Sequence, residues 1–376
     1  MTLISYASRI HFADGVLEEA LRSEMEVRRS VRPLIITLET DLEDEAIERV
    51  LAGLPLKSSV HFFHGVGEIP CEDAAGAIAR HYHSLDRDCL IAIGCARTID
   101  LAKISRFEIV QTGALRTRSN FKTTNDDAVR DLPDLYAVPD TLGLAAAVSP
   151  HASVVLSDGD SSHLTTSSLI PTVTICDPGL TIAETPDIAI SAAVESIARC
   201  IEAYLSSGYH PPASGMALDG LERAVSNLQQ ISGTMKLAVR REILAACLNS
   251  SLAQQKRLGA TQTIGNALCV ASGRNLDRGA MSRLILPEVL TWQKYEDDHK
   301  LSNLRRILKL DPKSTVTCGI QRIFEAIPLP GNLSALGLGD DDFEVAADLA
   351  ASDMALVFGS PFTGSDDLLS VLHAVR

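Results

Sequence analysis

The sequence predicts an α/β domain with a mostly parallel sheet over residues 1–180, followed by an all-helical domain over residues 181–376. Three observations carry this prediction. Short runs rich in β-branched residues alternate with segments of helical periodicity in the first half. Such a βαβα order implies parallel strands with helices on both faces of the sheet. From about residue 187 onward the helical periodicity continues, and strand-like runs disappear.

The elements of the first half follow one another in a regular order. Strands are expected at 32–39 (RPLIITLE), 58–66 (SSVHFFHGV), 88–95 (DCLIAIGC) and 134–140 (DLYAVPD). Helices are expected between them at 41–54 and 71–85 and from residue 98 onward. Two further strand-like runs, at 152–158 (ASVVLSD) and 171–178 (PTVTICDP), are interpreted as a local antiparallel addition to the sheet.

The second half begins with a helix over 192–206 (AAVESIARCIEAYLS), in which apolar residues recur at helical spacing. Glycine and proline interrupt the later helices at 208–215, 327–332 and 359–367. No internal repeat or low-complexity tract is present.

Composition excludes several classes of function. The net charge of −14 argues against a nucleic-acid partner or an anionic membrane surface, but it permits a small anionic substrate in a locally basic site. No run approaches the roughly 20 apolar residues of a membrane span, and the first residues do not resemble a signal peptide. The eight scattered cysteines contain no C-x-x-C motif and are expected to be reduced thiols. We therefore expect a soluble cytoplasmic protein.

One stretch of the first half has the pattern of an anion-binding turn. LIAIGCARTIDLAK (90–103) is a strand, a tight turn with Gly94, and a helix whose first N–H groups can face a phosphate. The loops VGEIP (66–70) and VPDTLGLAAAVSP (138–150) also follow predicted strands, where open α/β sheets bind ligands. An ordinary βα connection is the alternative interpretation of the turn.

Polar residues at helical spacing are the candidates in the second half. Glu195 and Arg199 are four residues apart, as are Gln262 and Asn266, and Arg278 follows a glycine-containing turn. A surface ion pair and ordinary helix capping are the alternatives for these groups. After residue 163 the histidines are isolated, at 210, 299 and 373, so no transition-metal site is expected in the helical domain.

Several segments, in the right order, resemble the iron-type (group III) alcohol dehydrogenase superfamily, and within it the maleylacetate reductase branch. DCLIAIGCARTIDLAK is similar to the family's glycine-rich segment that ends D-x-A-K. YAVPDTLG, PTVTICDPGLTIAETP, ESIARCIEAYLS, GAMSRLILPEVL and the C-terminal helices from residue 343 also resemble family motifs. The resemblance covers nearly the whole chain and implies a dehydroquinate synthase-like architecture. It further implies a dinucleotide-binding N-terminal domain, NAD(P) as cofactor, a divalent metal in the interdomain cleft, and a homodimer.

The resemblance places the helical-domain candidates at the family's metal and site positions. Glu195 stands where the family usually has an Asp ligand, and Arg199 where it has a His. Gln262, after a small length adjustment, matches the next His, Asn266 replaces another site histidine, and Arg278 matches the last one. A guanidinium is always protonated and has no lone pair to give a cation. We therefore predict a metal-free site, and the maleylacetate reductase branch also departs from the usual ligand set.

The expected cofactor site departs from the family pattern too. Cys95, Ala96 and Arg97 replace the family's later glycines and serine, which let a pyrophosphate approach the backbone. Arg97 either blocks that approach or contacts a phosphate. In the next loop Asp140 and Thr141 replace a Thr-Thr pair, and Asp140 would repel a pyrophosphate.

Three functions remain open at this point. The first is a metal-independent reduction of a small carboxylated or oxo-substrate with NAD(P)H, in which Arg199 and Arg278 clamp the anionic group and Glu195 orients Arg199 or acts as a general base. The second is a non-redox enzyme with an arginine-lined anion site. The third is a non-catalytic homologue that serves as a binding subunit.

Overall fold

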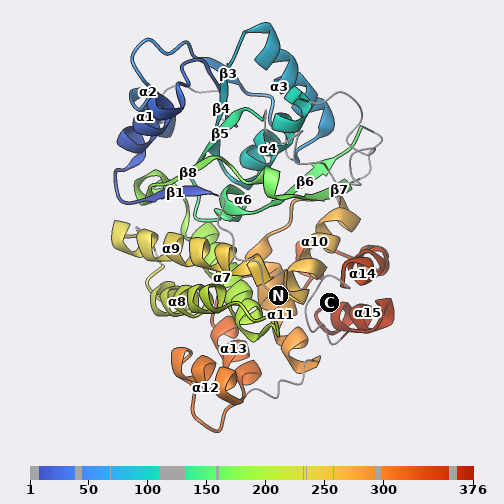
Figure 1. Ribbon diagram of the computed structural model, residues 1–376. Coiled ribbons are helices and arrows are strands. Elements are labelled where there is room, and N and C mark those ends of the chain that lie inside the picture. Colours follow the sequence, from blue (N-terminus) through green and yellow to red (C-terminus); the bar gives the residue numbers. More distant parts are fainter. Residues whose placement is uncertain are drawn as a thin grey trace. The chain divides into compact units, whose positions relative to one another are not determined.

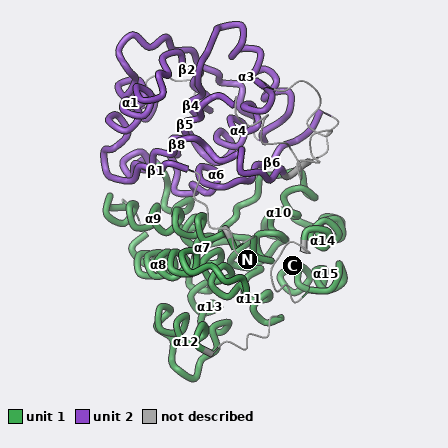
Figure 2. The backbone as a smooth tube through the Cα atoms, in the orientation of Figure 1, with its two compact units in different colours: residues 1–4, 184–376 green, residues 5–183 purple. Residues whose placement is uncertain are grey.

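The computed structural model describes residues 8–38, 45–67, 69–110, 132–157, 161–231, 233, 235–256, 258–292, 298–354 and 362–376. The chain divides into two compact units (Figures 1 and 2). The first along the chain, Ser5–Ala183, is purple in Figure 2, and the second, Glu184–Arg376, is green. The sequence placed this boundary between residues 180 and 181. Each unit is described by itself below.

The first unit is built on a six-stranded parallel sheet in the described part of the chain, with the order β1-β8-β5-β4-β2-β3. Its strands are β1 (Arg9–Phe12), β2 (Pro33–Ile36), β3 (His61–Phe63), β4 (Cys89–Gly94), β5 (Asp134–Pro139) and β8 (Val173–Cys176). In the central pair, Cys89 lies opposite Asp134 and Gly94 opposite Pro139. The carboxyl ends of β4 and β5 therefore meet at one edge of the sheet.

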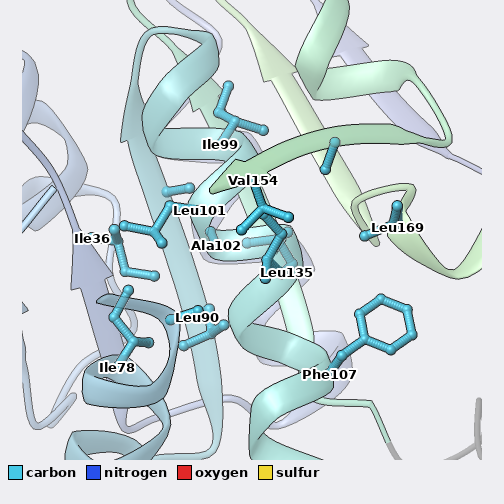
Figure 3. Close-up of a cluster of buried hydrophobic side chains, with 14 of the residues drawn as sticks. Ile36, Ile78, Leu90, Ile99, Leu101, Ala102, Phe107, Leu135, Val154 and Leu169 are labelled. Carbon is cyan, nitrogen blue, oxygen red and sulfur yellow. The ribbon is translucent and has the colours of Figure 1, made fainter. Parts of the chain in front are cut away.

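Helices cover both faces of this sheet. They are α1 (Leu17–Arg28), α2 (Glu45–Ala52), α3 (Glu72–Ser84), α4 (Ala96–Val110) and the short α6 (Ala145–Val148), with 3₁₀ turns at Ser167–Leu169 and Pro178–Thr181. Alternate strand residues point to opposite faces. Ile36, Leu90 and Leu135 pack against α3 and α4 (Figure 3), whereas Ile35 and Ile91 belong to the core shared with α1 and α2.

The predicted parallel sheet is confirmed, but the interpretation of its last strand was wrong. Residues 171–178 were expected in an antiparallel addition, whereas β8 lies between β1 and β5 and runs parallel to both. All four of its residues are buried, as in an interior strand. The antiparallel pair is instead β6 (His151–Val155) with β7 (Ser161–Thr165). The first four residues of the predicted helix 41–54 lie outside the described residues.

The second unit is helical throughout its described residues. Its α-helices are α7 (Pro186–Leu205), α8 (Pro211–Leu228), α9 (Leu237–Ala253), α10 (Ala260–Ser272), α11 (Arg278–Trp292), α12 (Asp298–Ile307), α13 (Val316–Glu325), α14 (Asp340–Met354) and α15 (Ser365–Ala374). Short 3₁₀ turns lie at Gln254–Lys256 (η5) and Ser334–Leu336 (η6). Helix α7 begins with a proline at its first position and is buried along most of its length. Within the described residues no helix has the length and apolar character to cross a membrane.

Candidate functional site

The turn between β4 and α4 keeps the tight geometry of a phosphate-binding turn. Gly94, the last residue of β4, has φ +139°, which favours glycine. A Cβ at this position would lie 2.8 Å from the Thr98 Oγ1 atom of the first helical turn. No other residue therefore fits between the strand and the helix without distortion. The turn delivers the amino-terminal end of a 15-residue helix to the carboxyl edge of the sheet.

The residues after Gly94 obstruct a phosphate less than the replacement of the family's glycines suggested. Cys95 is half-buried, Ala96 is exposed and begins α4, and Arg97 is half-buried. Small side chains therefore flank the turn, and one cation lies in the first turn of the helix. The backbone geometry and the cation both fit a nucleotide phosphate, which this turn would hold through N–H groups and Arg97.

Asp140 and Thr141 lie beside this turn. They follow β5, whose last residue pairs with Gly94, and both are half-buried. The register therefore brings Asp140 to the same edge of the sheet as Cys95. A carboxylate there opposes an anion, so the cofactor-binding role of Asp140 and Thr141 stays a prediction.

A buried lysine that was not among the predicted site residues supports the same helix. Lys103 of α4 is fully buried, and its Nζ donates to the His151 carbonyl oxygen at 2.8 Å and to Asp100 Oδ1 at 3.3 Å. Burial lowers the pKa of Lys103, and the nearby Asp100 opposes that shift. The lysine joins α4 to the β6–β7 hairpin. Its signal in the sequence was the lysine of the D-x-A-K segment, flanked by Leu101, Ala102 and Ile104.

Glu195 and Arg199 form an ion pair on α7. The Arg199 Nη2 atom lies 2.5 Å from Glu195 Oε1, and Nε donates to the same oxygen at 3.1 Å. Arg199 Nη1 also donates to Gln254 Oε1 of η5 at 3.4 Å. The two charged side chains are 14% and 13% exposed, so the pair is shielded from water rather than spread over a surface. The alternative of a plain exposed pair is therefore wrong.

Helices α10 and α11 bring Asn266 and Arg278 into contact. Gln262 and Asn266 are one turn apart on α10 and share a face. Arg278, the first residue of α11, donates from Nη1 to Asn266 Oδ1 at 2.5 Å. Its guanidinium also lies 3.9 Å from the Cβ position of Gly265, between the two amides along the chain. Among the described residues, no carboxylate forms an ion pair with Arg278.

A close crossing of α7 and α11 fixes the position of Arg278. Asp277 caps α11 by accepting from Ala280 N at 2.8 Å, and Ser191 of α7 donates to the same oxygen at 2.5 Å. Gly279 N donates to Ser191 Oγ at 3.1 Å. A Cβ on Gly279 would lie 2.3 Å from the Ser191 carbonyl oxygen, so only glycine permits this approach.

Glu202, one turn after Arg199, holds the start of α10. Its Oε1 accepts from Thr261 N at 2.9 Å, and Gly259 leaves the space that its carboxyl group fills. Its Oε2 has no hydrogen-bond partner among the described residues. Burial raises the pKa of Glu202 to about 7, against the opposing effects of the Thr261 hydrogen bond and the Arg199 charge.

The side chains that the resemblance predicts at the family's metal positions do not fit a divalent cation. Glu195 supplies the one carboxylate, and the Arg199 guanidinium engages it. Arg199 and Arg278 carry fixed positive charges and offer no lone pair, and an amide oxygen of Gln262 is a weak ligand for iron. No group of three potential His, Cys, Asp or Glu ligands occurs among the residues that the structure describes.

A parallel sheet with a glycine turn and a helix amino terminus at its carboxyl edge is typical of nucleotide-binding α/β proteins. The sequence profile described as iron-containing alcohol dehydrogenase matches residues 7–178, and the C-terminal profile of the Fe-containing alcohol dehydrogenase family matches residues 189–375. The chain belongs to the iron-containing alcohol dehydrogenase family, a family of oxidoreductases. The resemblance seen in the sequence is confirmed.

Relatives of this chain act on different substrates. The chain is similar to a 4-hydroxybutyrate dehydrogenase from Cupriavidus necator, with 27% identity over 92% of each chain. It is 24% identical to a maleylacetate reductase from Burkholderia cepacia over 92% of this chain and 89% of the relative. A sulfoacetaldehyde reductase from Bifidobacterium kashiwanohense, solved in complex with NAD+, has the same fold, with 16% identity, a TM-score of 0.85, and coverage of 100% and 98% of the two chains.

Proposed function

We propose that this protein is an NAD(P)-linked oxidoreductase that interconverts a small carboxylated oxo-compound and its alcohol without a divalent metal at the family's site. The observation that carries the proposal is the Glu195–Arg199 pair, in which a fixed cation takes the carboxylate that a metal would need. The family membership supplies the class of reaction.

The β4–α4 turn supports the nucleotide part of the proposal. Gly94 keeps the strand and helix close, and Arg97 adds a cation to the amino-terminal turn of α4. Helix N-terminal N–H groups and a guanidinium are both suited to a pyrophosphate. When bound, the nicotinamide supplies or accepts the hydride. The fold neighbour solved with NAD+ agrees with this choice of cofactor.

The charges of the helical unit support a metal-independent site. Where a family member has a metal to polarise a carbonyl oxygen, this chain has a guanidinium held in place by Glu195 and Gln254. A positioned cation in a shielded site stabilises developing negative charge on oxygen as a Lewis acid does. Glu195 orients that cation, and its carboxylate is engaged rather than poised as a general base.

The activities of two relatives support a carboxylated substrate. 4-Hydroxybutyrate and maleylacetate both carry a carboxylate in addition to the carbon that is oxidised or reduced. Arg278 offers such a group a guanidinium with no ion-pair partner among the described residues. We expect substrates with a carboxylate to be preferred over neutral alcohols of the same length.

A non-catalytic or non-redox homologue is the second candidate, and Asp140 is the observation that favours it. Its carboxylate lies at the edge where a pyrophosphate would bind, because β5 pairs with β4 in register up to Gly94. An anion at that edge weakens nucleotide binding through like-charge repulsion.

Equilibrium binding of NAD(H) and NADP(H), with metal content measured on the same purified sample, separates these functions. We expect one nucleotide to bind while the metal content stays far below one ion per chain. Turnover of 4-hydroxybutyrate with that nucleotide should exceed turnover of 1,4-butanediol. Failure of both nucleotides to bind would exclude hydride transfer and leave the second candidate.

A pair of glycine variants tests the nucleotide site itself. Gly94→Ala places a Cβ against Thr98 in a left-handed backbone region, so the turn must distort. We expect nucleotide binding to weaken by about 10-fold or more, as for the loss of one charge-assisted hydrogen bond. Gly76→Ala in α3, where only the flexible end of Arg80 is near, is the control and should bind normally. Equal binding by both variants would contradict the assignment of the turn.

A further inference from the structure

We infer that Gln262, Asn266 and Arg278 form a receptor for a single carboxylate group, and that this receptor selects the substrate. The inference rests on the proposed function for its place in catalysis, but the receptor itself can be tested without nucleotide. It assigns the anionic group of the substrate to Arg278 rather than to a clamp of Arg199 and Arg278.

The two arginines differ in how far their charges are balanced. Arg199 is already neutralised by Glu195, which lies 2.5 Å away and is shielded from water. Arg278 contacts only a neutral amide among the described residues, through one of its five N–H donors. A half-buried guanidinium keeps its remaining N–H donors available to a ligand. Arg278 is therefore the arginine whose whole charge is available to a carboxylate, whereas Arg199 offers only a partly balanced charge to a carbonyl oxygen.

The neighbouring side-chain amides have hydrogen-bond donors that no described residue uses. Gln262 is only 5% exposed, and its side chain forms no hydrogen bond with the described residues, although its amide atoms are not fully closed off from solvent. Buried side-chain amides are nearly always hydrogen-bonded in proteins. Asn266, one turn along on the same face, presents its oxygen to Arg278, which leaves its NH2 group as a donor. The face thus carries unused N–H donors beside an unneutralised cation.

The arrangement of these donors suits a carboxylate. A carboxylate has two oxygens that accept in a plane, and a guanidinium binds it through two parallel N–H groups. Amide N–H groups can take the remaining lone pairs. The Asp277–Ser191 contact and Gly279 hold Arg278 in this position before the ligand arrives. Preorganised donors of this kind favour one carboxylate over a neutral group of the same shape.

Binding of butyrate, with butyramide as the uncharged probe of the same shape, tests the inference. The titrations use the full chain without nucleotide, in low-chloride buffer, by ligand-observed NMR or calorimetry. We expect butyrate to bind and butyramide to bind about 10- to 100-fold more weakly, the range for one charged hydrogen bond. Equal binding of the two probes, or no binding of butyrate, would overturn the inference.

Two variants locate the receptor. Arg278→Gln removes the charge. Asn266→Asp replaces the amide that Arg278 contacts with a carboxylate, so that the cation is neutralised within the protein. Both should lose butyrate binding by about 10- to 100-fold. Arg274→Gln, which removes an exposed cation bound to the Gly337 carbonyl oxygen, is the control and should bind as the wild type does.

The failures of the two proposals are distinguishable. Retained binding in Arg278→Gln, in which Arg199 is intact, would assign the carboxylate elsewhere. Butyrate binding that depends on Arg278, in a protein that binds neither NAD(H) nor NADP(H), would keep the receptor and reject only the redox function. Circular dichroism of each variant at the titration temperature verifies that the helical unit is folded.

Discussion

At the scale of single residues, the helical unit contains charged groups that are buried or largely shielded from water. Arg199 neutralises Glu195, and Lys256 donates to the carbonyl oxygen of Ala203 at 3.0 Å near the end of α7. Burial and, to a smaller extent, the charge of Lys300 together lower the pKa of Lys256 to about 8. Glu202 is less well satisfied, because its second carboxyl oxygen has no partner among the described residues.

Glu202 makes the stability of the helical unit depend on pH. Its pKa in the folded chain, about 7, lies above the usual value of 4.5, so the folded state holds the proton more tightly than the unfolded state does. This contribution is complete below pH 4.5 and is lost as the pH rises through 7. The shift corresponds to about 3 kcal/mol of unfolding free energy.

The Glu202→Gln variant should remove this dependence. Glutamine keeps an oxygen for Thr261 N and does not ionise, so relative to the wild type the variant gains about 3 kcal/mol between pH 4 and pH 8.5. Urea unfolding of both proteins at the two pH values measures the difference. A difference between the proteins that does not change with pH would show that Glu202 ionises normally.

At the scale of elements, sequence periodicity predicted which segments form helices and strands, but it did not predict how they pair. The runs at 32–39, 88–95 and 134–140 were located correctly because interior parallel strands are continuous apolar runs. The same property misled the assignment of β8, since an apolar run carries no information on its neighbours. Strand β1 was missed because Arg9 and His11 make it a polar edge strand.

The crossing of α7 and α11 is an element-scale feature with a direct test. In Gly279→Ala the new Cβ would meet backbone atoms of Ser191 at 2.3–2.6 Å, which no rotamer change can relieve. We expect a loss of about 1–3 kcal/mol in unfolding free energy. The control, Gly215→Ala, adds its Cβ to open space on the exposed side of α8 and should gain up to about 1 kcal/mol. Equal effects in the two variants would contradict the close crossing.

At the scale of the whole molecule, the resemblance found in the sequence predicted the family and the architecture, because its motifs occur in order along nearly the whole chain. It also led to a prediction of the side chains at the metal positions, which stays a prediction. What it could not supply was their partners. Gln254 and Glu202 were not among the candidates, since each acts through a residue distant in sequence, as Glu202 does through Thr261.

The response of the whole protein to added ligands is the consequence that the site chemistry predicts most directly. A ligand that binds only the folded chain raises its stability by about 2.7 kcal/mol at 100 times its dissociation constant. We therefore expect saturating NADH or NADPH to raise the melting temperature after dialysis against EDTA. Iron(II) or zinc at millimolar concentration should leave it unchanged, because Arg199 and Arg278 repel a cation at the family's metal positions. The matched variant is Glu195→Gln, which lacks the one carboxylate of the set. A metal-dependent rise in the wild type that is absent from Glu195→Gln would mean that Glu195 releases Arg199 and binds the ion, and the metal-independent reaction would then be excluded.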